Sequence, residues 1–582
     1  MGYNYWNGTE AAHRRVMMKA AGYSDEDIRQ KPHIGIPNSY MAGSPGTAHL
    51  RQVTEAVKEG IWAAGGIPVE FGIPATCGNV ANGADEMKYE QVGRDIVAMS
   101  IEFVSRIHNF DAICCVASCD LIIAGCYLAA CRLDIPALVV TGGSMQAGNY
   151  CGKTVVEADL DAARFSGASE AELFEMEESV CPSFGACPSM GTANTMQMLG
   201  EVLNLVMPGT STIPASDNAR LRAARTAGKY MVQLARSGKT PKDLITKDVL
   251  ENAIMFDMAV AGSTNAVLHI LAYAYELGIK LTLADFEKYA KEIYCINAVI
   301  PSGPYTVVDF HYAGGVKQVM KQLAGKIHTD APTIYGDTTW GELLDSVKSA
   351  PNKVIHSLED PVAKEPGLKI MRGNISPAGA IVRPTAVYEE VKYIKGAAKV
   401  YECDQDAYRA IMAGEIVAGD ILVIRYEGCK GAPGMKELML SIDALIGLGL
   451  DKKVGLITDA RFSGFLSEQS ASFPGSAILS SADFLRVRSL AFLAASLARW
   501  DITDFSTMIL PTAGFCSRKI SSCLLTTLST APLASLLPSF CLVWPSNCGS
   551  SILTLMIAVR PSRISSPLKF GSLSRRSLFF LA

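Results

Sequence analysis

Three features that mark other classes of protein are missing from this sequence of 582 residues. There is no excess of basic residues, since the formal net charge is -4, so we expect no nucleic-acid partner. The first residues, MGYNYWNGTEAAHRRV, hold no apolar run of the kind that a secretory signal needs. The 16 cysteines include no CxxC pair, which disfavours a zinc finger or a ferredoxin-type cluster motif. We therefore expect a cytoplasmic protein, in which clustered cysteines more often bind metal or do chemistry than form disulfides.

The first part of the chain alternates between short apolar segments and amphipathic ones. HIGIPNS, FDAICCVAS and IPALVVTGG have the length and composition of strands, whereas AHLRQVTEAVKEGIWAAGG and YEQVGRDIVAMSIEFVSRI have the apolar period of helices. A long helical stretch follows them. This order predicts an α/β domain over residues 1–365 with a mostly parallel sheet, whose ligands bind where the strands end.

A second type of sequence begins near Pro366. Short strand-like segments separated by glycine turns, such as KVYEC, GDILVIRYEG and KVGLITDARFSG, predict a smaller β-rich, barrel-like C-terminal domain over residues 366–464. The pattern stops at Gly464, so we expect this domain to be truncated or replaced beyond that residue.

Residues 465–582 are rich in serine and leucine, and acidic residues become rare there. A membrane segment would explain why no charged residue lies between Lys519 and Arg560, but Pro532, Pro538 and Pro545 interrupt it. A disordered tail would explain the serines but not the many leucines and phenylalanines. We favour a third interpretation, a change of reading frame in the gene, and we expect no contact with a membrane.

Candidate functional residues lie at the predicted ends of strands. Cys119 and Cys187 stand beside glycine, serine or proline, so they are either thiolate ligands of an iron–sulfur or zinc centre or simply buried cysteines. Asp120 and Glu427 are carboxylates of the type that Mg²⁺ uses, although most carboxylates are only solvated. Ser463 has no adjacent histidine and no GxSxG motif, which disfavours a serine hydrolase.

Seven motifs occur in a fixed order along the chain: PGTAHL, CD-x-x-x-x-G, GG-x-M-x-AG, GAC-x-x-MGTANTM, GSTNAVLH, YEG-x-KGAPGM and ITDARFSG. Together they resemble the dihydroxy-acid dehydratase and phosphogluconate dehydratase family, from about residue 5 to Gly464. One of these motifs alone would be weak, but seven in order are specific. The resemblance implies an iron–sulfur hydro-lyase that takes a small 2,3-dihydroxy acid, either a sugar acid or a branched-chain acid, to a 2-keto acid. It also implies a homodimer or a higher homo-oligomer.

The resemblance also implies a role for each motif residue. In the family a cluster iron acts as Lewis acid on the C3 hydroxyl, Mg²⁺ orients the carboxylate and the C2 hydroxyl, and a serine alkoxide takes the C2 proton. Cys119 and Cys187 match the cluster ligands, and Cys77 is a candidate third ligand. The remaining matches are Asp120 and Glu427 for Mg²⁺, Ser463 for the base, and Gly142, Gly143, Ser263, Thr264 and Asn265 for substrate binding.

Three positions depart from the family pattern. Gly46 stands where many members carry a cysteine, so the cluster is either a [2Fe-2S] or a [4Fe-4S] type. Gly78 stands where an aspartate is expected on Mg²⁺, and Leu121 stands where a lysine, as a carbamate, would ligate the same ion. Two hypotheses follow, a working dehydratase, or a divergent and catalytically impaired relative that binds a cluster or a partner without turnover.

Overall fold

The computed structural model describes residues 5–348, 350–428 and 434–462, together with three short strands farther along the chain. The chain divides into two compact units, residues 1–488 and 489–582. In the second unit the described part is one antiparallel pair, β13 (Met508–Ile509) with β14 (Thr554–Leu555). The predictions for residues 465–582 and for truncation after Gly464 therefore fall almost wholly outside the described residues. No helix among the described residues is long and apolar enough to cross a membrane.

The first sheet is wholly parallel, as predicted. Its order is β2 (Ile67–Gly72), β1 (His33–Asn38), β3 (Ala112–Ala117) and β4 (Ala137–Thr141). Every residue of β1, β3 and β4 is buried, which explains why these segments read as continuous apolar runs rather than as alternating ones. The α/β fold with a parallel sheet is confirmed.

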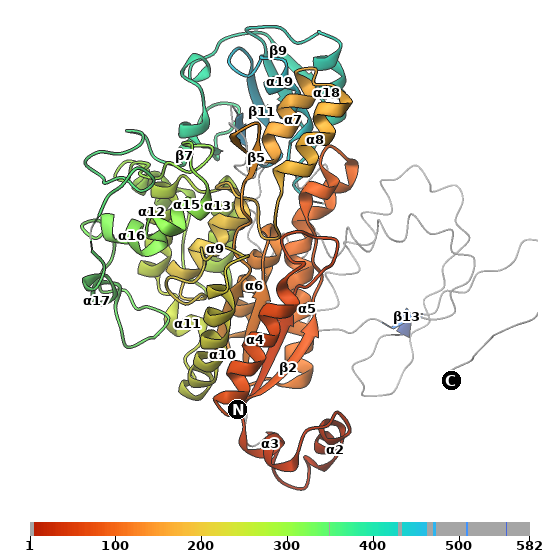
Figure 1. Cartoon of the computed structure of the whole chain (residues 1–582), viewed down its shortest axis with the longest axis vertical. Coiled ribbons are helices and arrows are strands. Elements are labelled where there is room, and N and C mark those ends of the chain that lie inside the picture. The colour runs from red at the N-terminus through yellow and green to blue at the C-terminus, as the bar shows by residue number, and fades with distance from the viewer. Residues whose placement is uncertain are drawn as a thin grey trace, which may run out of the picture. The chain divides into compact units, whose positions relative to one another are not determined.

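Helices cover both faces of this sheet (Figure 1). Cys114 and Val116 of β3 pack in one cluster with α4 (Leu50–Ala63) and α10 (Ala219–Ser237). The alternate residues Cys115 and Ala117 pack in another with α5 (Glu90–His108) and α6 (Asp120–Leu133). Because successive strand residues point to opposite faces, four adjacent apolar residues serve two cores.

The helical middle of the chain extends the second of these cores. Helix α6 is buried over nearly its whole length and packs against α9 (Thr192–Val202) and α13 (Thr264–Glu276), and α12 (Lys247–Val260) packs against α9. An apolar sequence on every side, such as DLIIAGCYLAACRL, is what a fully enclosed helix requires. The other α-helices described before the second sheet are α2 (Ala12–Ala20) and α3 (Asp25–Gln30), which precede β1, and α7 (Glu157–Phe165), α8 (Glu170–Val180), α11 (Pro241–Leu244), α14 (Leu283–Tyr289), α15 (Val307–Tyr312), α16 (Gly315–Gln322) and α17 (Trp340–Asp345). Strand β5 (Gly148–Tyr150) pairs antiparallel with β6 (Lys153–Val155).

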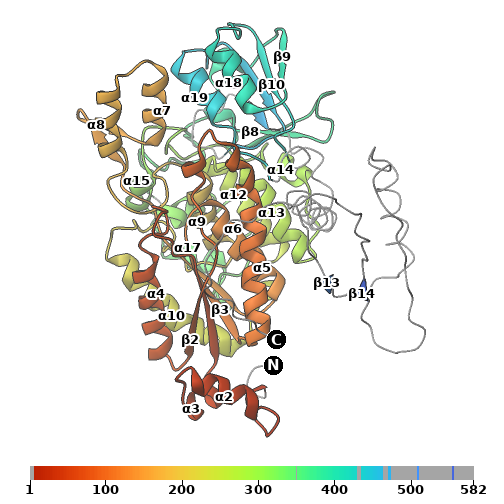
Figure 2. The ribbon, with the colours of Figure 1, turned by 90° about the vertical axis from the view of Figure 1, so that its right-hand side faces the viewer.

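The second sheet has six strands in the order β7 (Lys369–Met371), β8 (Ala380–Val382), β12 (Ser470–Ser472), β11 (Gly455–Thr458), β10 (Ile421–Ile424) and β9 (Ala398–Tyr401). The last four are parallel, and β7, β8 and β12 pair antiparallel. Helices α18 (Asp404–Met412) and α19 (Leu440–Gly447) share its core, at the opposite end of the first unit from β2 and β3 (Figure 2). Among the described strands, β7 and β9 are the two edge strands of this sheet. Closure of the sheet into a barrel and the bounds of the two domains stay predictions.

Candidate active site

A small cavity that is open to solvent lies at the carboxyl end of β3, where the α/β pattern predicts ligand binding. It lies between the loop after β2, the first turn of α6, the loop before α9 and the segment before α19. Its lining residues are Cys77, Gly78, Asn79, Cys119, Asp120, Cys187, Ser189, Gly191, Thr192, Ala193, Asn194 and Glu437. Four of the predicted ligand residues are therefore brought together, Cys77 among them.

Three thiols form one side of the cavity. The Cys119 thiol donates a hydrogen bond to Cys77, which lowers the pKa of Cys77, while the same bond and burial raise the pKa of Cys119 well above its usual range. Burial also raises the pKa of Cys187, and Asn79 Nδ2 lies 3.6 Å from its Sγ atom. The thiols come from three separate loops, and free cysteines that converge on a cavity are suited to hold a metal centre.

The backbone fixes Cys119 tightly. It stands between β3 and α6 with a φ of 73°, a conformation that is strained for a residue with a side chain. A Cβ atom added to Gly46 would lie 3.4 Å from Cys119 Sγ, so the glycine leaves room for the sulfur. Cys114, Cys115, Cys126 and Cys131 are instead enclosed in the apolar cores.

Two carboxylates, those of Asp120 and Glu437, line the other side of the cavity, and Glu90 lies beside them. Oxygen atoms of Glu90, Asp120 and Glu437 lie within 4.8 Å of one another. Burial and the charge of Glu90 raise the pKa of Asp120 to about 7, and burial raises the pKa of Glu437 well above its usual range. Arg461 forms ion pairs with both Glu90 and Glu437. Because three ionised carboxylates exceed the charge of one guanidinium, this group is suited to a divalent cation.

Backbone pairing sets Glu437 beside Arg461. The two residues form an isolated parallel bridge, in which Leu438 N donates to Arg461 O at 3.1 Å. Asn265 Nδ2 donates to Glu437 Oε1 at 3.2 Å, and the Arg461 Nε atom donates to Met435 O at 2.7 Å. The sequence motifs did not single out Glu437 or Glu90.

Glu427, the predicted magnesium ligand, lies elsewhere. It is buried, and its Oε1 accepts from Asp404 N at 2.8 Å, while its own amide donates to Asp459 Oδ1 at 3.1 Å. It is not among the residues that line the cavity. The structure therefore sets Glu437 beside Asp120, and the role of Glu427 stays a prediction.

The predicted substrate residues lie behind the lining. Gly143 N donates to Gln197 Oε1 at 2.7 Å, so this amide is already used inside the protein. Ser263 caps α13 and lies 2.8 Å from Thr192 Oγ1. The Thr264 hydroxyl donates to Phe462 O at 2.8 Å, next to the predicted base Ser463, which lies outside the described residues. Direct contact with substrate stays a prediction for Gly142, Gly143, Ser263, Thr264 and Asn265.

One more carboxyl group borders the thiols. Glu157, the first residue of α7, lies beside Cys187, and burial raises the pKa of Glu157 to about 7. Its sequence context, the start of an amphipathic helix, is ordinary for a glutamate and gave no signal.

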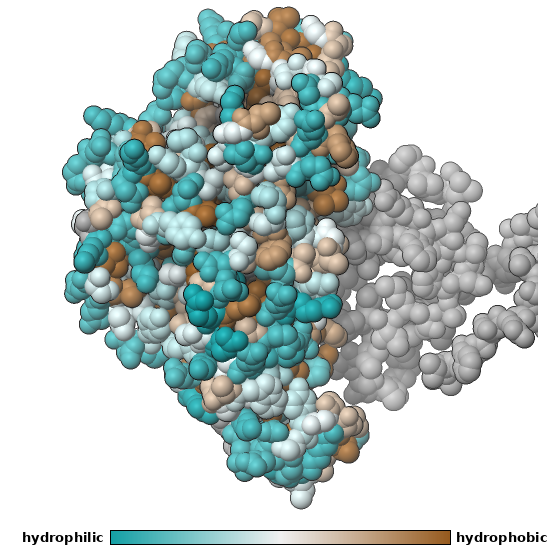
Figure 3. Space-filling view, in the orientation of Figure 1, coloured by the Kyte–Doolittle hydropathy of each residue, from teal (hydrophilic) through white to brown (hydrophobic). Residues whose placement is uncertain are grey.

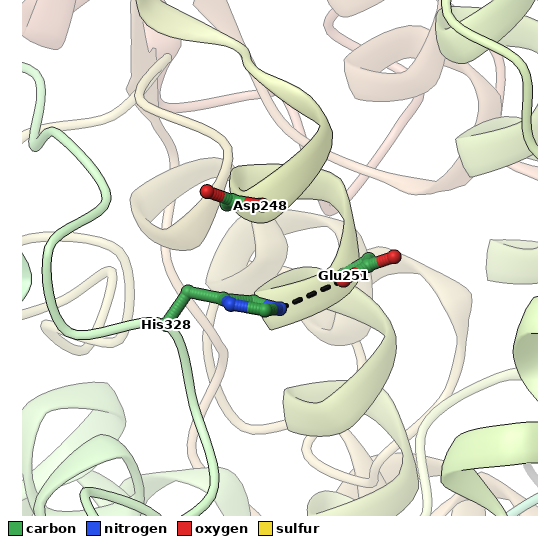
Figure 4. A group of neighbouring side chains, drawn as sticks. All are labelled: Asp248, Glu251 and His328. Atoms are coloured by element: carbon green, nitrogen blue, oxygen red, sulfur yellow. Dashed lines mark hydrogen bonds and ion pairs between the residues drawn. The ribbon is translucent and has the colours of Figure 1, made fainter.

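A second group of possible metal ligands lies away from the cavity (Figure 4). The group consists of Asp248, Glu251 and His328. Its Glu251 carboxylate already accepts hydrogen bonds from Tyr289 at 2.6 Å and from His328 at 2.7 Å. Asp248 is exposed. The group is therefore explained as a hydrogen-bonded cluster near the surface.

Comparison with known proteins supports one family. The sequence matches the N-terminal model of the dihydroxy-acid/6-phosphogluconate dehydratases over residues 31–342 and the C-terminal model over residues 353–472. It is 42% identical over 463 residues to the dihydroxy-acid dehydratase of Caldanaerobacter subterraneus, covering 78% of this chain and 83% of that protein. The dihydroxy-acid dehydratase of Pyrococcus abyssi is 42% identical over 464 residues, which cover 78% of this chain and 84% of the relative. The chain belongs to the dihydroxy-acid/6-phosphogluconate dehydratase family, and is thus of a hydro-lyase type.

Proposed function

We propose that this chain removes water from a 2,3-dihydroxy acid, either a branched-chain or a sugar acid, to give the 2-keto acid. The observation that carries the proposal is a single cavity with three thiols on one side and carboxylates on the other. The names of the relatives, dihydroxy-acid dehydratase, agree with this reaction. A hydroxyl is a poor leaving group and a C2 proton is weakly acidic, so a dehydration needs both kinds of assistance.

The thiol side fits an iron–sulfur cluster, either [2Fe-2S] or [4Fe-4S]. Cys77, Cys119 and Cys187 would hold it, since their three thiols converge on the same cavity. When bound, the cluster would supply a Lewis acid toward the C3 hydroxyl, the group that a dehydration expels together with the C2 proton as one water molecule. Asn79 donates toward Cys187 Sγ and stabilises the negative charge of that thiolate.

The carboxylate side fits Mg²⁺, which prefers oxygen ligands. When bound, this ion supplies positive charge toward the carboxylate and the C2 hydroxyl of the acid. Ser463 takes the C2 proton in this proposal. The hydrogen bond of Thr264 to the carbonyl of Phe462 fixes the backbone immediately before that serine.

The second candidate function is a catalytically impaired relative that binds a cluster without turnover. Leu121 and Gly78 favour it, because neither can ligate the divalent ion. In the described residues Leu121 is buried and is not part of the cavity lining.

Anaerobic purification separates the two functions. The chain is reconstituted with iron and sulfide, and is then assayed for keto-acid formation from a panel of branched-chain dihydroxy acids and sugar acids, with and without Mg²⁺. A brown protein with Mg²⁺-stimulated turnover supports the dehydratase. A brown protein that is inert on the whole panel supports the impaired relative, and a chain that takes up no iron contradicts both.

One pair of variants tests the third cluster ligand. Cys77→Ser should lower the iron content and bleach the visible absorption, because serine is a poor iron ligand. Cys151→Ser, at an exposed cysteine away from the cavity, is the matched control and should keep both. Full iron content in Cys77→Ser would remove Cys77 from the proposed ligand set.

An apolar stripe on α5 supports the proposed homo-oligomer. Ile96, Met99, Phe103 and Ile107 are 42%, 56%, 65% and 61% exposed, and their spacing sets them on one face of the helix. Figure 3 shows that the face of the described residues seen in the orientation of Figure 1 is largely hydrophilic, with scattered apolar residues. Phe103→Glu should lower the mass in solution measured by light scattering if this stripe is the interface, and an unchanged mass would contradict it.

A further inference from the structure

The side chain of Glu90 occupies the space that a side chain at residue 78 would need. A Cβ atom added to Gly78 would lie 2.6 Å from the Glu90 Cδ atom and closer still to its Oε1. Contacts under 3 Å are not tolerated between such atoms, so a side chain at residue 78 and the present position of Glu90 exclude each other. The Glu90 carboxylate therefore fills the volume that an aspartate at position 78 would enter.

Glu90 reaches this place from helix α5, of which it is the first residue. Its side chain is only 7% exposed and is turned toward Asp120 and Glu437. A glutamate that begins a helix normally faces solvent, where it costs nothing to keep it charged. Burial here points instead to a partner for the negative charge.

The positive charge of Arg461 neutralises only part of the negative charge of the three carboxylates. Three carboxylates against one guanidinium leave two negative charges if all four groups are ionised, which equals the charge of one divalent cation. The Oδ1 atom of Asn265, whose amide nitrogen contacts Glu437, is buried and has no donor among the described residues. A water bound to the cation is a donor that could reach such an atom.

We infer that Glu90 supplies the carboxylate that Gly78 cannot, so that this chain binds a divalent cation through Glu90, Asp120 and Glu437. The ligand set is then made entirely of carboxylates and water, without the lysine that Leu121 replaces. The inference rests on the proposed function only in taking the cation to be the one that orients the substrate.

Binding of Mn²⁺, followed by the electron paramagnetic resonance signal of the free ion, tests this without any activity measurement. The reconstituted full chain should bind one Mn²⁺, which Mg²⁺ displaces. Glu90→Gln should weaken binding about tenfold or more. Glu102→Gln, on the same helix, and Glu251→Gln, in the cluster of Figure 4, are matched controls and should bind Mn²⁺ as the parent does.

Moving the carboxylate from residue 90 to residue 78 distinguishes the loss of a metal ligand from a folding defect. Glu90→Ser should weaken Mn²⁺ binding, and Gly78→Asp added to it should restore binding, because the aspartate then enters the vacated space. Wild-type affinity in Glu90→Gln, or no recovery in a folded Gly78→Asp/Glu90→Ser chain, would overturn the inference.

Iron content and keto-acid formation in the same samples keep the two proposals apart. Binding of Mn²⁺ that depends on Glu90, without turnover by the unsubstituted chain, contradicts the proposed function alone. Turnover with Mn²⁺ binding that is indifferent to Glu90 contradicts the inference alone.

Discussion

The cavity has two sides that are built from different parts of the chain. The sulfur side consists of Cys77, Cys119 and Cys187, and the oxygen side of Glu90, Asp120 and Glu437. The sulfur side lies within the residues of the N-terminal family model, whereas the oxygen side also needs Glu437 and its partner Arg461 from the C-terminal one. A change in the C-terminal region should therefore disturb the oxygen side and leave the sulfur side in place.

The two sides are also stabilised differently. Backbone geometry holds the sulfur side, through the positive φ of Cys119 and the close approach of Gly46. Ion pairs with the buried Arg461 hold the oxygen side, together with a hydrogen bond from Asn265 to Glu437. Backbone constraints are insensitive to pH and salt, whereas buried charges respond strongly to pH.

The largest effect is expected from Cys119→Ser. The iron content should fall to background because a proposed cluster ligand is lost, while the oxygen side should still bind Mn²⁺. Iron analysis and Mn²⁺ titration of the same sample measure both. Cys131→Ala, in the core of α6, is the control and should keep its iron. A Cys119→Ser chain with normal iron would show that the sulfur side holds no cluster.

The convergence of the sulfur side could be predicted because its cysteines belong to ordered sequence motifs. Cys119 and Cys187 lie inside two of the seven motifs, whereas Cys151 and Cys181, which also stand beside glycine or proline, lie outside them. The oxygen side could not, because 57 residues are acidic and their local context is uninformative. Glu90 begins a helix, as many glutamates do, and its contact with Gly78 exists only in the folded chain.

The fold, too, could be predicted from the sequence only in part. The apolar segments predicted as strands became β1, β3 and β4. KVYEC overlaps β9, and GDILVIRYEG and KVGLITDARFSG contain β10 and β11. The packing of α7 against α19, which joins parts of the chain far apart in sequence, had no signal. Periodicity reports which face of an element is buried but not which element covers it.

The next largest effect is expected from Arg461→Gln. Removing the guanidinium leaves Glu90 and Glu437 buried without their shared counter-charge, which should cost about 3–5 kcal/mol of unfolding free energy. Denaturant unfolding measures the loss. Saturating Mg²⁺ should restore part of it if the oxygen side binds the ion. A variant as stable as the parent would show that this pairing contributes little.

Burial and the charge of Glu90 raise the pKa of Asp120 to about 7. We therefore expect the stability of the folded chain and its Mn²⁺ affinity to depend on pH, an effect of intermediate size. In metal-free protein the folded chain then holds a proton that an unfolded aspartate, with a pKa of about 4, has lost, so stability falls as the pH rises between these values. Asp120→Asn should remove this slope in thermal unfolding. Mn²⁺ affinity of the parent should fall about tenfold per pH unit below that pKa, because binding displaces the proton. A slope unchanged in Asp120→Asn would assign the dependence to other groups.

The smallest effect is expected from Thr264→Val, which removes one hydrogen bond between α13 and the carbonyl of Phe462. The loss should cost about 1 kcal/mol of unfolding free energy. Neither side of the cavity contains Thr264, so iron content and Mn²⁺ affinity should stay at the level of the parent. Turnover should nevertheless fall, because the backbone that carries Ser463 is then less tightly held. Thr226→Val, on the exposed face of α10, is the matched control for loss of a threonine hydroxyl. A Thr264→Val chain with full turnover would show that this hydrogen bond is needed neither to position the backbone before Ser463 nor to bind substrate. Equal losses of iron and turnover would mean that the two sides are not independent.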